Sequence, residues 1–383
     1  MTSREVFLET CRFGSPGRHY SWECVGTWET TLRVWAQQGY TGGESYADFI
    51  DYFGMEWNVG FMNFAQETGI DSGFTTTPFW PGFGWEVLQD EGATRVVRTD
   101  GGIVQRELAV ATDTSMPQFL AFPVSSRQDW EQLKHRLDPF SPGRYPADWA
   151  SLKSRYGPGR EFVLGLPLNG AYGMLRNLMG PENILYAFYD EPELVADMLI
   201  HWEWFSKGLI SVLSAQLDFD YVLLWEDMCY KAGPLISPEM FRRFISPHYL
   251  AVIDHAKSCG IPVAAVDTDG QCDPLIPLFI DAGVGLLFPL EVQSGMDPRE
   301  VRKKYGKNLA LLGGLDKRPL VKGKAAIDAE VQAKLPWLLE QGGFFPSLDH
   351  TAPPDIPLAN FRYYLEAVRR AAAGFFGGQA ALY

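Results

Sequence analysis

From about residue 125 onward, short apolar runs alternate with amphipathic segments, and this rhythm constrains the fold more than any other feature. We expect buried strands at 161–170, 221–227, 261–270, 284–291, 309–316 and 342–350. Continuous apolar strands separated by helices are typical of a parallel sheet covered on both faces. Six such strands, with two more from the first 125 residues, predict an α/β protein with a (β/α)8 TIM barrel fold. The alternative is an open doubly wound sheet, which the lack of a GxGxxG phosphate loop after any strand disfavours.

The segments between these runs predict helices. Their apolar spacing and capping residues place them at 125–137, 192–216, 237–244, 273–281, 298–305, 324–341 and 358–373. Ser237 is a typical helix cap with proline directly after it, and Pro247 should kink that helix.

The first 120 residues follow a different pattern. A helix is expected at 30–39, and alternating β-formers around the TDGG turn predict an antiparallel hairpin insertion at 72–111. We therefore interpret residues 1–383 as one barrel domain. Its N-terminal extension and insertion occupy about 1–120, and regular β/α units occupy about 121–383.

The charge balance excludes several partners. The formal net charge is −14, whereas proteins that grip nucleic acid or anionic membranes need clustered Lys and Arg. No apolar run is long enough for a membrane span, and the N-terminus has no apolar signal core, so we expect a cytoplasmic protein. The five cysteines form no CxxC pair, which disfavours a zinc ribbon or a disulfide framework.

Acidic side chains and a histidine follow three of the predicted strands. The strand ends carry Glu226 and Asp227, Asp267 and Asp269, and Asp349 and His350. In barrel enzymes the carboxyl ends of the strands meet at one mouth, where the chemistry takes place. We therefore expect one site to which several strand ends contribute.

The second half of the chain resembles the uroporphyrinogen decarboxylase superfamily. The resemblance covers roughly 220–370 and is carried by SPEMFRRFISPHY, GMDPREVRKKYGKNLALLGGLDK and GGFFPSLDHTAPPDIPLANFRYYLEAVR. It implies a (β/α)8 barrel with the site at the C-terminal mouth, and a tendency to form homodimers.

The resemblance implies two chemistries. Decarboxylases of this superfamily carry an Arg-rich N-terminal motif, of which only Arg18 and Tyr20 are echoed in FGSPGRHYSWE. Corrinoid-dependent methyltransferases hold zinc through a His-x-Cys pair and a later Cys. At the matching places this chain has Asp267-Thr268-Asp269 and His350, so oxygen and imidazole replace the thiolates.

These residues predict a divalent metal site, with zinc as the first choice. The candidate ligands are Asp267, Asp269 and His350, with Glu226 as a fourth, because residues two apart on a strand share a face. Without a metal, Glu226 and Asp267 would be an acid/base pair, with His350 and Asp227 as further catalytic candidates. A turn at Asp269 and a helix cap at Asp267 explain the same pattern without chemistry.

Other polar and aromatic residues at strand ends are candidates for substrate contact. They are Glu23, Asn169, Tyr172, Trp225, Glu291 and Asp316. Asn169 and Tyr172 have groups that can hydrogen-bond a ligand, and Glu291 can support the metal ligands. Core packing is the simpler reading of Trp225, and an ion pair is the simpler reading of Asp316.

The leading hypothesis is a metal-dependent methyltransferase of the corrinoid-linked O-demethylase or methylcorrinoid type, acting on a small methylated substrate. The corrinoid would come from a partner protein, because the chain has no DxHxxG signature. The alternative is a metal-free decarboxylase or lyase of a small carboxylated substrate, with Arg18 holding the carboxylate. A non-catalytic binding barrel is a third reading, and the cost of burying so many acids speaks against it.

Overall fold

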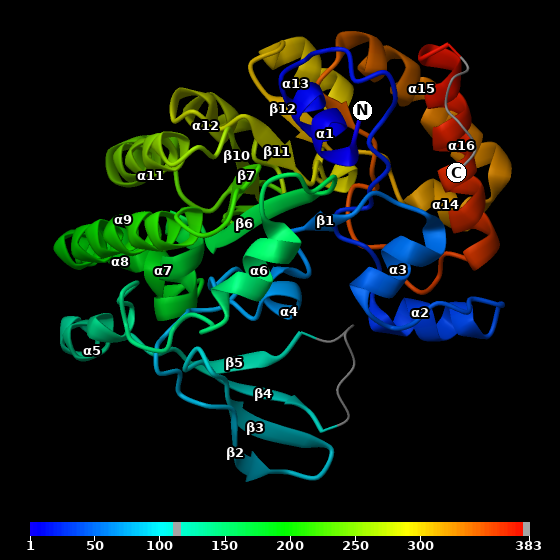
Figure 1. Cartoon of the computed structure of the whole chain (residues 1–383). Coiled ribbons are helices and arrows are strands. Elements are labelled where there is room, and N and C mark those ends of the chain that lie inside the picture. Colours follow the sequence, from blue (N-terminus) through cyan, green and yellow to red (C-terminus); the bar gives the residue numbers. More distant parts are fainter. Residues whose placement is uncertain (110–115, 378–383) are drawn as a thin grey trace.

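The computed structural model describes residues 1–109 and 116–377, and a curled parallel sheet forms its centre (Figure 1). The strand order is β1-β6-β7-β10-β11-β12-β13, and every neighbouring pair is parallel. The strands are β1 Asn58–Val59, β6 Val163–Asn169, β7 Tyr221–Trp225, β10 Val263–Asp267, β11 Leu286–Phe288, β12 Ala310–Leu312 and β13 Phe344–Phe345. Every residue of these strands except Trp225 is buried, which explains why the sequence runs are continuously apolar.

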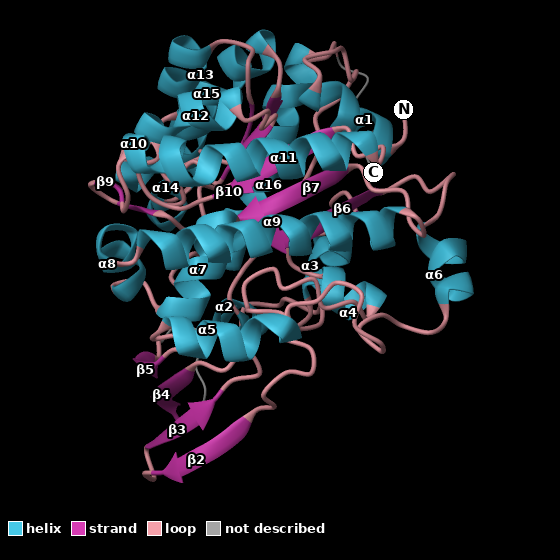
Figure 2. Ribbon diagram, turned by 90° about the vertical axis from the view of Figure 1, so that its left-hand side faces the viewer, coloured by secondary structure: helices cyan, strands magenta, loops and turns pink. Residues whose placement is uncertain are grey.

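Helices cover the outside of this sheet, as Figure 2 shows. In the N-terminal half they are α1 Ser3–Cys11, α2 Glu29–Ala36, α3 Tyr46–Phe53, α4 Phe64–Thr68, α5 Arg127–Leu133, α6 Trp149–Tyr156, α7 Ala171–Met179 and α8 Asn183–Asp190. The rest are α9 Pro192–Ser214, α10 Pro238–Met240, α11 Ser246–Ser258, α12 Ile276–Asp281, α13 Pro298–Tyr305, α14 Arg318–Lys322, α15 Lys324–Gln341 and α16 Leu358–Phe375. The arrangement is TIM-barrel-like.

The expectation of eight regular strands needs correction. In the described residues the first 125 positions supply only β1 to the parallel sheet. Residues 20–27 lie near both outer strands without a regular ladder: the Ser21 carbonyl accepts from Glu56 N (2.7 Å) and the Gly26 carbonyl accepts from Ala352 N (3.0 Å). Gly26, at φ 63°, and the start of α2 end this extended run before it forms a strand.

A second sheet lies at the side of the barrel where β6 and β7 end (Figures 1 and 2). It is antiparallel, in the order β2-β3-β4-β5, with β2 Glu86–Asp90, β3 Thr94–Arg98, β4 Val104–Leu108 and β5 Gln118–Ala121. Cross-strand ion pairs join Arg95 to Glu107 (2.8 Å) and Arg98 to Glu86 (2.6 Å). This region, where the sequence predicted a hairpin, therefore has four strands.

The helix expected around Pro247 is interrupted instead of simply bent. A π-helical turn, Phe241–Ile245, separates α10 from α11, and the Ser246 N–H bonds the Phe241 carbonyl. Proline has no N–H for the usual helical bond, and a wider turn absorbs that loss. Among the described helices, none combines the length and apolar character that a membrane crossing requires.

Candidate functional site

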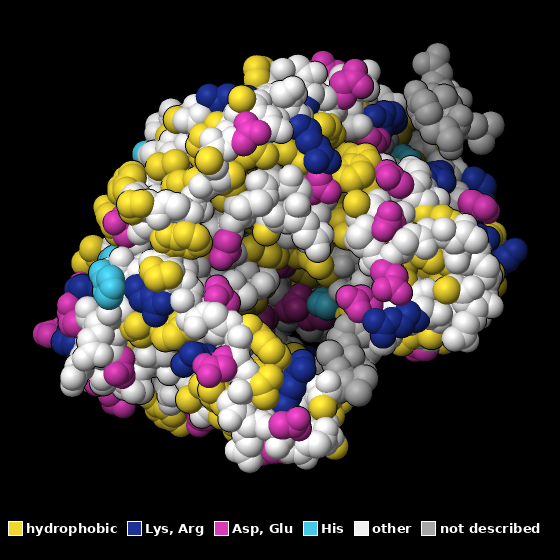
Figure 3. Space-filling model, turned by 60° about the horizontal axis from the view of Figure 1, so that its bottom comes forward, with side chains coloured by type: hydrophobic (Ala, Val, Ile, Leu, Met, Phe, Trp, Pro, Cys, Tyr) yellow, Lys and Arg dark blue, Asp and Glu magenta, His cyan; other side chains and the backbone are white. Residues whose placement is uncertain are grey.

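Three side chains of metal-binding types meet at the carboxyl edge of the parallel sheet. Asp269, Glu291 and His350 follow β10, β11 and β13, and one ligand atom from each lies within 4.8 Å of the other two. His350 Nε2 is 3.3 Å from Asp269 Oδ2. All three residues are partly exposed, and Figure 3 shows acidic side chains and a histidine inside a hollow of the surface. We call these three residues the acidic cluster.

Gly270 sets the positions of two members of the acidic cluster. Its N–H donates to Glu291 Oε2 at 2.8 Å, and Ser294 Oγ donates to the same oxygen at 3.2 Å. Gly270 has φ 78°, and a Cβ there would lie 2.8 Å from the Cys229 carbonyl carbon. The glycine after Asp269 is therefore required by the close approach of two loops.

The charge on His350 depends on Asp269. Burial acts to lower the pKa of His350, but the hydrogen bond and the negative charge of Asp269 outweigh it, so the net pKa is raised. The preceding residue, Asp349, contacts backbone instead: it accepts from Val292 N and Lys317 N, both at 3.1 Å. Burial raises the pKa of Asp349 to about 6.

The donor set of the acidic cluster fits a divalent metal. Two carboxylates and one imidazole are ligands that zinc, iron and manganese accept. With zinc bonds of about 2.0–2.1 Å, a tetrahedral site separates two ligand atoms by about 3.4 Å, close to the 3.3 Å between His350 and Asp269. The two atoms are also within hydrogen-bond reach, although 3.3 Å is longer than the about 2.7–2.9 Å of a strong charge-assisted bond.

Four residues in register form the next layer below the mouth. Asn169, Trp225, Asp267 and Phe288 are lateral partners on β6, β7, β10 and β11. Asp267 is 6% exposed, and its carboxyl group has no hydrogen-bond partner among the residues described. Burial, followed by the charges of Asp269 and Asp227, raises its pKa well above the usual value. Asp267 is therefore a buried neighbour of the cluster whose raised pKa favours the protonated form, and it is not one of the cluster's three members.

Asp227 faces the same mouth in a strained backbone conformation. Its φ of 43° is in the left-handed region, which few non-glycine residues adopt and which is often found at functional sites. The carboxylate forms an ion pair with Arg176 of α7. Burial raises the pKa of Asp227; Arg176 opposes that shift, and the charges of Asp269 and Glu291 add to it.

Glu226 lies behind the sheet, away from the acidic cluster. It is completely buried, and accepts from the Tyr249 hydroxyl and from Gly173 N (2.8 Å). Burial raises its pKa to about 7, against hydrogen bonds from Tyr249 and the first residues of α7. An anion at a helix N-terminus is stabilised by the free N–H groups there, so Glu226 anchors α7 and does not join the metal-binding group.

Glu23 also serves the fold. Its Oε2 accepts from Ser347 Oγ and Leu348 N, both at 2.9 Å, and Oε1 accepts from Tyr364 at 2.8 Å. Burial raises its pKa to about 7. These bonds join residues 20–27 to the segment after β13, so Glu23 fastens the closure of the sheet.

The remaining candidates divide between the mouth and the scaffold. Asn169 donates to the Gly73 and Thr76 carbonyls and so holds a loop over the mouth. Tyr172 is buried, and its hydroxyl has no hydrogen-bond partner among the described residues. Trp225 is half-buried, with the Arg176 guanidinium 5.5 Å from its ring.

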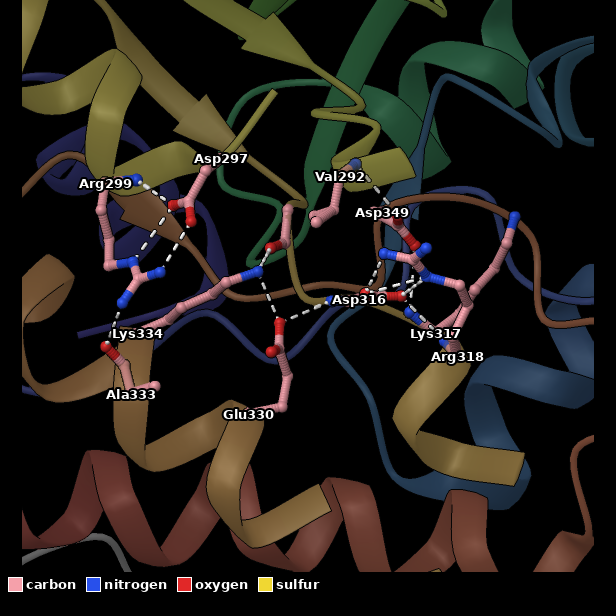
Figure 4. A network of polar contacts seen from close by, with 11 residues as sticks. Val292, Asp297, Arg299, Asp316, Lys317, Arg318, Glu330, Ala333, Lys334 and Asp349 are labelled. Atoms are coloured by element: carbon pink, nitrogen blue, oxygen red, sulfur yellow. Dashed lines mark hydrogen bonds and ion pairs between the residues drawn. The ribbon is translucent and has the colours of Figure 1, made fainter. Parts of the chain in front are cut away.

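Asp316 belongs to a structural network between the segment after β12 and the middle of α15 (Figure 4). Its carboxylate pairs with Arg318 (2.6 Å), and its N–H donates to Glu330 (2.8 Å). Lys334, almost fully buried, bonds Glu330 and the Gly314 carbonyl. The ion pair, the simpler of the two expectations for Asp316, is the one observed.

The fold and the acidic cluster together define an α/β barrel-type protein with its polar residues at the carboxyl edge of the strands. A family model for uroporphyrinogen decarboxylase (URO-D) matches residues 109–371, and the chain belongs to this family. Membership indicates an enzyme, and it agrees with the resemblance seen in the sequence.

Solved structures extend the comparison of the fold. A methyltransferase from Methanosarcina mazei is similar, with a TM-score of 0.58 and 13% identity over 98% of this chain and 100% of that one. A Listeria monocytogenes structure described as a vitamin-B12 independent methionine synthase has a TM-score of 0.41 and 12% identity, over 94% and 98% of the two chains. No curated protein sequence matches the chain.

Two contributors to the site had less support in the sequence. Glu291 was expected only behind the metal ligands, yet it is a member of the acidic cluster. Its position at the end of the strand predicted at 284–291 was the available signal. Arg176, the cation nearest Asp227, was not singled out, because nothing in the sequence of α7 separates it from a surface arginine.

Proposed function

We propose that the chain is a metal-dependent methyltransferase acting on a small methylated substrate. A divalent metal, zinc as first choice, would be held by Asp269, Glu291 and His350. The observation that carries the proposal is the convergence of these three ligand types at the carboxyl edge of the strands. Family membership and the likeness in fold to a methyltransferase support it.

The proposed ligand set differs from the one expected from sequence. Glu226 and Asp267 are replaced by Glu291, because Glu226 is bonded behind the sheet and Asp267 lies outside the three-residue group. The metal, when bound, supplies Lewis acidity to an oxygen of the methyl donor. Asp267 is the group to which we assign proton delivery: as the C–O bond breaks, the methyl group leaves to its acceptor and the oxygen takes up the proton.

The methyl acceptor or donor on the other side of the reaction is proposed to be a corrinoid carried by a separate protein. The chain has no DxHxxG sequence of its own. The acidic cluster is partly exposed, so a second reactant can approach it from solvent.

The decarboxylase alternative loses its proposed anion-binding residue. Arg18 pairs with Glu56 and lines a cavity together with Gly342 and Gly343, which precede β13. His350 follows β13, so Arg18 lies at the opposite end of the strand from the acidic cluster. A decarboxylase at this mouth would depend on Arg176 instead.

The test is metal content together with methyl transfer. Purified protein, supplied with zinc, iron or manganese, is analysed for bound metal beside an Asp269→Ala, His350→Ala variant and an exposed control, Asp254→Asn. We expect about one metal per chain in wild type and control and none in the double variant. Methylcobalamin formation from free cob(I)alamin and methoxylated donors should follow the metal. Equal metal in all three proteins, or transfer that persists in the double variant, would reject the proposal.

A further inference from the structure

Helix α7 presents two side chains on one face that have hydrogen-bond donors to spare, Tyr172 with its hydroxyl and Arg176 with part of its guanidinium. Tyr172 and Arg176 are four residues apart, so they project from the same side of the helix. The Tyr172 hydroxyl is buried without a partner, and within residues 1–109 and 116–377 Arg176 uses only Nη1, toward Asp227. A buried donor without an acceptor is costly, and it marks a place where a ligand can supply the acceptor.

Gly173 brings these donors against an aromatic surface. A Cβ at Gly173 would lie 2.3 Å from the Trp225 carbonyl oxygen and 3.0 Å from its ring, so α7 and Trp225 are in close contact. Phe74 meets Trp225 edge-on at 6.5 Å between ring centroids. Phe61 continues this wall, with centroids 5.1 Å from Phe74 and 5.1 Å from Phe288.

The aromatic wall runs toward the acidic cluster. Trp225 is the register partner of Asp267, and Asp267 is the register partner of Phe288. Glu291 follows Phe288 by three residues, and Asp269 follows Asp267 by two. The donors therefore lie at one end of a row of aromatic rings packed edge to face, and the proposed metal ligands lie at the other end.

We propose that Arg176 and Tyr172 form a carboxylate-binding subsite and that the substrate is an aromatic carboxylate carrying a methyl group on a ring oxygen. The ring packs on Trp225 and Phe74, the carboxylate receives hydrogen bonds from Arg176 and Tyr172, and the methylated oxygen faces the acidic cluster. The inference rests on the proposed function only in calling this molecule the substrate.

The donors favour an anion over a cation of the same size. Aromatic walls also bind quaternary ammonium groups, but here the Arg176 guanidinium, 5.5 Å from the centroid of the Trp225 ring, already serves as its cation. A quaternary ammonium ion accepts no hydrogen bond, so it would leave the Tyr172 hydroxyl unpaired. A carboxylate pairs with Tyr172 and with the free side of Arg176.

The experiment measures binding in metal-free protein, with a chelator present and no corrinoid. Titration calorimetry compares 4-methoxybenzoate with its neutral amide, 4-methoxybenzamide, and with 4-methoxyphenyltrimethylammonium. We expect the carboxylate to bind about tenfold to a hundredfold more tightly than the amide. Equal binding of the acid and the amide, or tighter binding of the ammonium compound, overturns the subsite.

Variants assign the preference to the two residues. Arg176→Gln should abolish the preference for the carboxylate, and Tyr172→Phe should reduce it severalfold. Arg155→Gln, an exposed arginine on α6, should leave it unchanged. Should Arg176→Gln fold poorly, the wild-type comparison still decides. Because no metal or methyl transfer is involved, a failure here is separate from a failure of the proposed function.

Discussion

Glu226 and Asp269 follow neighbouring strands, yet their surroundings are opposite. Glu226 is fully buried behind the sheet and is bonded by a tyrosine hydroxyl and backbone N–H groups. Asp269 is partly exposed at the mouth, where its polar neighbours are another acid and a histidine. A carboxylate with its acceptor sites filled by the scaffold supports the fold, whereas one left to face other ligand types is available for chemistry.

Glu23 and Asp267 differ in the same way, one supporting the fold and the other left without hydrogen-bond partners in the part of the chain that the structure describes. Both are almost fully buried acids with raised pKa values. Glu23 has three hydrogen-bond partners that fasten the closure of the sheet, whereas the Asp267 carboxyl has none among the described residues. A raised pKa by itself therefore does not distinguish a structural acid from a reactive one.

The largest expected effect comes from removing two members of the acidic cluster. Asp269→Asn with His350→Gln should weaken metal binding at least about a hundredfold and abolish metal-dependent activity. The free energy of unfolding of the metal-free protein should change by less than about 1 kcal/mol, because both side chains are partly exposed. Metal titration checks the loss of binding, and urea unfolding checks the unchanged stability. A large loss of stability would show that Asp269 and His350 support the fold, as Glu226 does.

The second-largest effect is expected at Glu226, the structural carboxylate of the comparison. Glu226→Ala should lower the free energy of unfolding by about 3 kcal/mol, because it leaves the Tyr249 hydroxyl and the N-terminus of α7 without an acceptor. Metal binding to the folded variant should be retained. Urea unfolding measures the stability, and metal content is measured on the same sample. A variant that loses the metal but keeps its stability would contradict the structural role of Glu226.

A smaller effect is the pH dependence contributed by Glu23. Its pKa is raised from 4.5 to about 7 in the fold, so the protonated form is stabilised and the contribution is complete below about pH 4.5. It is lost as the pH rises toward 7. Relative to Glu23→Gln, a mimic of the protonated acid, wild type should lose about 2–3 kcal/mol between pH 4.5 and 8. Urea unfolding across this pH range measures how the stability difference between wild type and Glu23→Gln changes with pH. A wild type that gained stability over the variant as the pH rises would contradict the prediction.

The smallest effect is expected at the exposed ion pair of the network in Figure 4. Arg318 is about half exposed, so Arg318→Gln should cost less than about 1 kcal/mol despite its 2.6 Å contact with Asp316. Thermal unfolding measures it. A decrease of more than about 2 kcal/mol in the free energy of unfolding would show that the Asp316–Arg318 ion pair is a major support of the fold.

The sequence predicted the helices at 298–305 and 324–341 with the bounds of α13 and α15, because local residues mark their ends: Asp297 caps the start of α13, and Gly342 follows the end of α15. It also brought Asp269 and His350 to one mouth, through the rule that parallel strands end at one edge. The direction of Glu226 depends on the turn after Trp225, where Asp227 takes a positive φ. Neither that turn nor the ion pair with Arg176 has a local signal, so tertiary contacts decide them.

The closure of the sheet near Gly26 has a consequence for the order of folding. Thr31 donates to the Ala352 carbonyl across 321 residues of chain, and Gly26 bonds the same residue. During synthesis this seam stays open until residue 352 has emerged, and contacts so distant in sequence form slowly. Until then Glu23 lacks its partners and its burial, so its pKa stays near 4.5 and rises to about 7 only when the seam closes.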